Sequence, residues 1–119
     1  GSMVPTGLAV TAELERRGLS SRLCNMRFVK PLDSELLLDS VRDIKHVVTI
    51  EEHVKSGGFG SAVIDCLAQN GVHDVRVTVC ALPDYFIEHG DRLHLLEKYN
   101  MTTEKITDTI ISKTKQCRR

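Results

Sequence analysis

A glycine-rich loop is the stretch of this 119-residue sequence whose residue types and spacing are most suited to binding a ligand. It follows an expected strand and opens an expected helix, where backbone amides and the helix dipole can hold an anion. Two carboxylates at the end of that strand could act as acid and base or bind a metal. The residues concerned are Glu51, Glu52, Gly57, Gly58, Phe59, Gly60 and Ser61.

Neither the loop nor the carboxylate pair is a specific signature. The loop matches neither Gly-x-Gly-x-x-Gly nor the Walker sequence, so a tight turn that lets helix and sheet pack closely is favoured. Neighbouring residues of a strand point to opposite faces, so Glu51 and Glu52 need not converge. Solvated or interface carboxylates are favoured over a catalytic pair. The segment is therefore a candidate anion-binding or interface loop.

A second candidate segment, Leu82–Gly90, carries large apolar side chains that are unusual for a loop. Such side chains either cover the core of their own domain or dock on another domain or subunit. The sequence leaves both possibilities open. The candidate interface residues of this segment are Tyr85, Phe86 and His89.

The remaining nucleophiles and metal-ligand types suggest no further site, and we expect no catalytic residue and no metal ligand. The five histidines and four cysteines include no pair at the spacing of a zinc site. No serine stands in a Gly-x-Ser-x-Gly elbow. Cys66 falls on an apolar helix stripe, which argues against an activated thiol. The cysteines are expected to be free thiols in a reducing compartment.

Composition is that of an ordinary globular protein, with 41% hydrophobic residues and 16 basic residues balanced by 16 acidic ones. A neutral chain has no electrostatic footprint for nucleic acid or an anionic membrane, and no apolar run reaches the length of a membrane span. The one basic cluster is expected to be a solvated helix end. It comprises Lys113, Lys115, Arg118 and Arg119.

Helices and strands are expected to alternate along the chain. Helices are expected over 5–17, 33–44, about 60–70, after Asp91, and from about 102; strands are expected over 21–29, 46–50 and 75–81. Alternation of this kind predicts an α/β fold, a three-layer α/β/α sandwich with a mostly parallel sheet. A domain of this type that opens with a helix lacks the strand that should precede it, so the first strand is expected to be missing.

Three ordered blocks of the sequence resemble the 1-deoxy-D-xylulose-5-phosphate synthase family of transketolase-type enzymes. Arg27–Asp33 is similar to that family's strand-to-helix junction, and Thr49–His53 with Gly57–Val63 to its strand–loop–helix block. Leu82–Asp84, with the Phe-Ile-Glu-His-Gly run that ends at Gly90, is similar to its connector after the last strand. The middle block is shared with transketolases and 2-oxoacid dehydrogenase beta subunits, whereas the last block points to the synthase.

The resemblance implies that residues 1–119 are a single domain, the C-terminal transketolase-type domain of a larger three-domain enzyme. Such an enzyme condenses pyruvate with glyceraldehyde 3-phosphate, with loss of carbon dioxide, for isoprenoid and thiamine synthesis. The resemblance implies a cytoplasmic or plastid-stromal homodimer that uses thiamine diphosphate and Mg²⁺. The domain itself is expected to be inactive, serving to pack against the upstream domains and to assemble the dimer.

The family's cofactor motif is not found in this sequence. That motif begins Gly-Asp-Gly and ends in an asparagine pair, whereas Gly90-Asp91 is followed by Arg92 and no Asn-Asn occurs. The resemblance therefore implies no catalytic or cofactor-binding residue here. Two alternatives stay open: the matching domain of a transketolase or 2-oxoacid dehydrogenase beta subunit, and a stand-alone module that binds a phosphate ligand.

Overall fold

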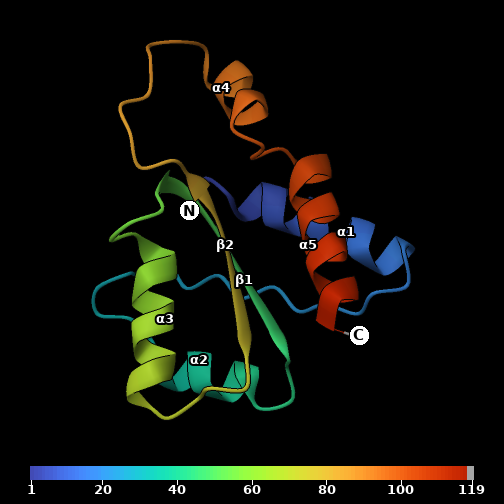
Figure 1. Ribbon diagram of the computed structural model, residues 1–119, viewed down its shortest axis with the longest axis vertical. Coiled ribbons are helices and arrows are strands. Elements are labelled where there is room, and N and C mark those ends of the chain that lie inside the picture. The colour runs from blue at the N-terminus through green and yellow to red at the C-terminus, as the bar shows by residue number, and fades with distance from the viewer. Residues whose placement is uncertain (118–119) are drawn as a thin grey trace. The chain divides into compact units, whose positions relative to one another are not determined.

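The computed structural model describes residues 1–117, so Arg118 and Arg119 of the expected basic helix end lie outside the described residues. The chain order is helix, helix, strand, helix, strand, helix, helix (Figure 1). The elements are α1 (Val4–Arg16), α2 (Ser34–Val41), β1 (His46–Val54), α3 (Phe59–Gln69), β2 (Arg76–Leu82), α4 (Arg92–Lys98) and α5 (Thr103–Cys117). They form two compact units, one of residues 26–84 and the other of residues 1–25 with the chain from Tyr85 onward.

The unit of residues 26–84 is built on a parallel sheet of β1 and β2. The two strands pair from His46 opposite Arg76 to Ile50 opposite Cys80, with an irregularity before Val54 pairs with Leu82. The β-branched run over residues 47–50 favours this extended backbone. The α/β fold class is confirmed, and the paired strands are parallel as predicted.

The core of this unit lies between α2 and α3. Leu37 and Val41 of α2 are buried with Val63 and Leu67 of α3, and Val47 is among the apolar side chains packed around them. Helical spacing places these pairs on one face of each helix, so the apolar stripes of α2 and α3 meet. The predicted helix ending at residue 44 in fact ends at Val41.

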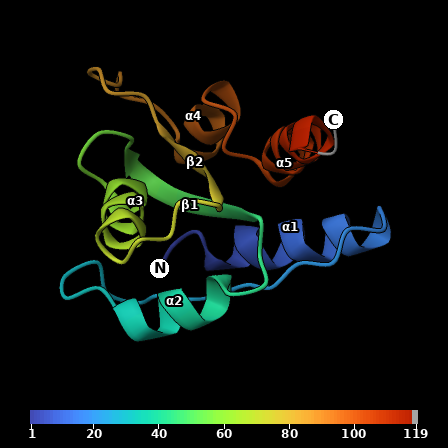
Figure 2. The same cartoon turned by 60° about the horizontal axis from the view of Figure 1, so that its bottom comes forward.

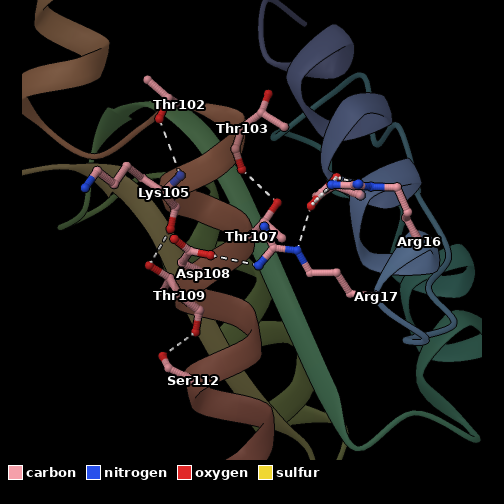
Figure 3. Close-up of polar contacts among 10 residues, drawn as sticks. Arg16, Arg17, Thr102, Thr103, Lys105, Thr107, Asp108, Thr109 and Ser112 are labelled. Atoms are coloured by element: carbon pink, nitrogen blue, oxygen red, sulfur yellow. Dashed lines mark hydrogen bonds and ion pairs between the residues drawn. The ribbon is translucent and has the colours of Figure 1, made fainter.

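The other unit holds α1 and α5 against each other (Figure 2). Val10 and Leu14 of α1 are buried, as are Ile106 and Ile110 of α5. Figure 3 shows the polar contact at the edge of this pair, where Arg17 reaches Asp108 with an N–O distance of 3.0 Å. Both side chains are exposed, and such an ion pair contributes little beyond the apolar contact.

The strand predicted over residues 21–29 is wrong. The segment carries no ladder partner, and Arg27 has φ of 59°, outside the extended region. Arg27 is the middle residue of a tight turn, in which Phe28 N–H donates to Met26 C=O at 2.5 Å. Phe28 is 65% exposed rather than buried on both faces of a sheet. Apolar density without a neighbouring strand to receive its hydrogen bonds does not form a strand.

Within residues 1–117, no helix combines the length and the apolar character required to cross a bilayer.

Candidate functional site

Glu51 occupies the position where the glycine loop meets α3. Its Oε2 accepts the N–H of Phe59 at 2.6 Å and its Oε1 accepts the N–H of Gly60 at 2.7 Å. The side chain comes from β1 and belongs to a residue only 7% exposed. One carboxylate therefore satisfies two of the amides that a helix leaves unpaired at its N-terminus, and its charge complements the helix dipole.

Glycine is required at two positions of the loop because neighbouring atoms leave no room for a Cβ. A Cβ at Gly58 would collide with the Glu51 carboxylate and would lie 2.6 Å from the carbonyl oxygen of Val54. A Cβ at Gly60 would lie 2.7 Å from both Cγ atoms of Val79. Gly57 has φ of 71°, a conformation that side chains strongly disfavour. Gly58 and Gly60 thus let α3 approach the carboxylate and the sheet.

Ser61 closes the loop from its C-terminal side. Its hydroxyl donates to the carbonyl oxygen of Lys55 at 3.2 Å and accepts the N–H of Gly57 at 3.1 Å. Phe59, at the first position of α3, packs with the apolar residues around the α2–α3 core. These contacts fix the backbone of the loop and of the first turn of α3.

The two glutamates differ in environment. Glu51 is buried against the loop, whereas Glu52 is half-buried and the following residue, His53, is exposed. The contacts of the Glu51 carboxylate are with backbone amides. Such a carboxylate is an acceptor that caps a helix.

Thr49 is a polar residue of this region that sequence reasoning missed. It is 3% exposed, and its Oγ1 has no hydrogen-bond partner. This oxygen lies 2.8 Å from the position that a Cβ on Gly60 would take, so it faces the first turn of α3. The only signal available in the sequence was one hydroxyl among the β-branched residues of the strand.

The connecting segment carries the second group of candidate residues. Tyr85 is 61% exposed, Phe86 is 97% exposed, and His89 is also exposed. The Tyr85 ring meets the Tyr99 ring edge to face, with 6.2 Å between centroids. Phe86 therefore covers none of the core, because almost its whole surface is in contact with solvent.

Glu88 anchors this segment to the end of α4 and was not predicted to have a role. The hydroxyl of Tyr99 donates to Glu88 Oε2 at 2.7 Å, and the ammonium of Lys98 pairs with Oε1. Hydrogen bonds from Lys98 first, and then from Tyr99, lower the pKa of Glu88 to about 2. The same Glu88 contact, followed by partial burial, raises the pKa of Tyr99.

Among residues 1–117, no group of three His, Cys, Asp or Glu side chains is placed to hold a metal ion.

The fold and this loop define a class of protein, the transketolase-type α/β domain. A solved structure described as a split gene transketolase, inactive beta4 tetramer, superposes with a TM-score of 0.84 and 35% identity. The match covers 94% of this chain and 36% of that one. The family model "Transketolase, C-terminal domain" matches residues 1–106. The chain belongs to the transketolase C-terminal domain family.

Several curated relatives of the chain are named 1-deoxy-D-xylulose-5-phosphate synthase. The Desulforudis audaxviator protein is 43% identical over 109 residues, which is 92% of this chain and 17% of that protein. The Shouchella clausii protein is 40% identical over 119 residues, 100% of this chain and 19% of that protein. The chain thus spans less than a fifth of the length of these two relatives.

Proposed function

We propose that this chain is the C-terminal domain of a 1-deoxy-D-xylulose-5-phosphate synthase and that its work is structural. The observation that carries the proposal is the 40% identity to the Shouchella clausii synthase across the whole chain. The 43% identity to the Desulforudis audaxviator synthase supports it. The name comes from proteins of which this chain spans 17% and 19%, so the reaction belongs to the complete enzyme rather than to this segment.

The complete enzyme, on this proposal, joins pyruvate to glyceraldehyde 3-phosphate and releases carbon dioxide, using thiamine diphosphate and Mg²⁺. The residues described here do not fit that cofactor. No cluster of metal ligands is present among residues 1–117, and the Phe59 and Gly60 amides at the α3 N-terminus are already bonded to Glu51. No step of the reaction is therefore assigned to this chain, which folds as one domain in the complete enzyme.

The domain's role is to pack against the upstream domains and to support a homodimer in the cytoplasm or plastid stroma. Phe86, at 97% exposure, and Tyr85, at 61%, supply the contact surface. Exposed aromatic side chains of this size contribute strongly when an interface buries them. The glycine loop is a second contact surface, held in shape by Glu51 and Ser61.

The alternative of a stand-alone phosphate-binding module is less well supported. It needs free amides at the α3 N-terminus, and those of Phe59 and Gly60 are bonded to a carboxylate of the same chain. A transketolase domain is the other alternative, since the matching solved structure has that name at 35% identity. The curated relatives favour the synthase.

A domain exchange tests the proposal. In the Shouchella clausii synthase, the region aligned with this chain is replaced by residues 1–119, and the rate of 1-deoxy-D-xylulose 5-phosphate formation is measured. We expect the chimera to keep most of the parent activity. A parent enzyme truncated before this region is expected to lose it, because an exposed domain interface is left behind.

Two controls test whether the effect of the domain exchange is specific to this chain and whether each protein is folded. A chimera that carries the matching region of a transketolase should be much less active than the one carrying this chain. Size-exclusion chromatography checks that each protein is folded and assembled. A folded, assembled chimera with this chain that is as inactive as the truncated enzyme would overturn the proposal.

A further inference from the structure

We propose that the first turn of α3 is an oxyanion site that the chain fills with its own Glu51 carboxylate. When that side chain is shortened, a small external oxyanion binds in its place. The inference is independent of the proposed function, since it concerns only the loop between β1 and α3. In the unchanged chain, the Glu51 carboxylate occupies the anion site of the glycine loop.

The contact geometry is that of a bound two-oxygen ligand. Each carboxylate oxygen takes one amide, Oε2 that of Phe59 and Oε1 that of Gly60, at 2.6 and 2.7 Å. These distances are at the short end of those for charge-assisted hydrogen bonds. Gly58 leaves room for the ligand, because a Cβ there would strike Glu51 Oε2. The backbone is thus shaped around an anion.

Thr49 is a second and independent feature of the same site. Its residue is 97% buried, as 3% exposure implies, and its hydroxyl has no partner. Buried hydroxyls in proteins are normally hydrogen-bonded, so an unpaired one facing the first turn of a helix indicates an unused donor. Thr49 and Glu51 alternate on β1 and so share one face of the strand. A ligand smaller than the Glu51 side chain can reach this donor.

The chemical class of the external ligand follows from these donors. Two converging amides and one hydroxyl select an anion with at least two oxygens. Acetate reproduces the missing carboxylate, and inorganic phosphate presents the same oxygen edge with more charge. Chloride offers a single centre and cannot accept from both amides in the same way.

The experiment uses Glu51→Ala in the 119-residue chain, with sodium acetate and sodium phosphate as probes. Backbone amide signals of Phe59 and Gly60 are followed by NMR, and thermal unfolding is followed by circular dichroism. We expect saturable shifts of these two amides and a rise in Tm with acetate or phosphate. Sodium chloride at equal ionic strength controls for screening. The unchanged chain should show no saturable shift.

Three further variants distinguish a site from a general salt effect. Glu51→Gln fills the same volume and offers an oxygen to one amide, so it should not bind acetate. Glu52→Ala removes a neighbouring carboxylate and leaves Glu51 in place, so it should not bind either. Adding Thr49→Val to Glu51→Ala should weaken binding by about threefold to tenfold, the usual effect of one hydrogen bond.

The results for Glu51→Ala and Glu51→Gln either support or reject the anion site. If Glu51→Ala folds and neither probe shifts the amides of Phe59 and Gly60 saturably, the proposal is wrong. If the variant is unfolded in chloride, recovery of its helical signal in acetate or phosphate supports the proposal. Failure to recover at any concentration of either probe rejects it. Acetate binding by Glu51→Gln would reject it as well.

Discussion

Gly60 is a position of the glycine loop that leaves no room for a side chain. A Cβ there would lie 2.7 Å from both Cγ atoms of Val79 and 2.8 Å from Thr49 Oγ1. Gly60→Ala should therefore lower the free energy of unfolding by about 1–3 kcal/mol, the usual cost of overpacking a core. Urea unfolding measures this loss.

Gly90→Ala is the matched control for that substitution. A Cβ at Gly90 would meet Leu95 at 3.5 Å, an ordinary van der Waals distance. Its effect should stay within about 0.5 kcal/mol, as for most surface substitutions. Equal losses of stability in the two variants would show that the close approach of α3 to the sheet is not what Gly60 provides.

The Glu88 cluster gives a prediction at acidic pH. Lys98 and Tyr99 lower the pKa of Glu88 from 4.5 to about 2. Because the folded-state pKa lies below the unfolded one, this contact stabilises the fold above pH about 4.5 and is lost as pH falls toward 2. The group is exposed, so the total effect on stability is small.

An NMR titration of the Glu88 carboxyl carbon tests this cause. Tyr99→Phe removes one of the two donors and should raise the titration midpoint, while Lys98→Met removes the larger contribution and should raise it further. A midpoint that does not move in either variant would mean that neither contact holds in solution.

At the scale of single elements, Asp33 caps the N-terminus of α2. Its Oδ1 accepts the N–H of Leu36 at 3.0 Å, at the start of α2. Asp33→Ala should cost about 1 kcal/mol of stability, typical of losing a cap. Asp43→Ala, at an exposed position after α2, is the control and should have little effect. A chemical denaturation curve for Asp33→Ala that overlays the parent curve would contradict this role.

Elements with strong local signals were predictable. The strand expected from residue 46, the helix expected after Asp91 and the helix expected from about residue 102 are found as β1, α4 and α5. The segment 21–29 was not, because apolar density says nothing about whether a neighbouring strand exists to pair with it. A strand forms only where a neighbouring strand pairs with it, and the sequence of one segment does not show whether that neighbour is present.

The candidate site was predictable in part. The glycines, which lie between an expected strand and an expected helix, pointed to a tight strand–loop–helix junction. The partner of the amides was not predictable, because Glu51 reaches Phe59 and Gly60 across eight and nine residues of loop. That contact depends on the path of the loop. The Glu88 contacts with Lys98 and Tyr99, ten and eleven residues away, depend on the path of the chain in the same way.

At the scale of the whole molecule, substitution of Phe86 should affect assembly much more than folding. The side chain is 97% exposed, so Phe86→Ser should change the stability of the 119-residue chain by less than about 0.5 kcal/mol. In the synthase chimera the same substitution should weaken dimerisation and activity, because an anchoring aromatic is lost. Analytical ultracentrifugation and rate measurements report the two effects.

Leu8→Ser supplies the control for Phe86. Leu8 is another exposed apolar residue, 59% exposed on α1, and lies outside the connecting segment. Its substitution should leave assembly of the chimera unchanged. If the Phe86→Ser chimera dimerises normally and keeps its activity, Phe86 is not part of the interface.

We propose that this domain supports an active centre built from other parts of a complete synthase. The most direct measurement is isothermal titration calorimetry of the 119-residue chain with thiamine diphosphate and Mg²⁺. No metal-ligand cluster is present among residues 1–117, and the α3 amides of Phe59 and Gly60 are bonded to Glu51. We therefore expect no saturable heat of binding. A clear isotherm with one site and micromolar affinity would contradict the claim.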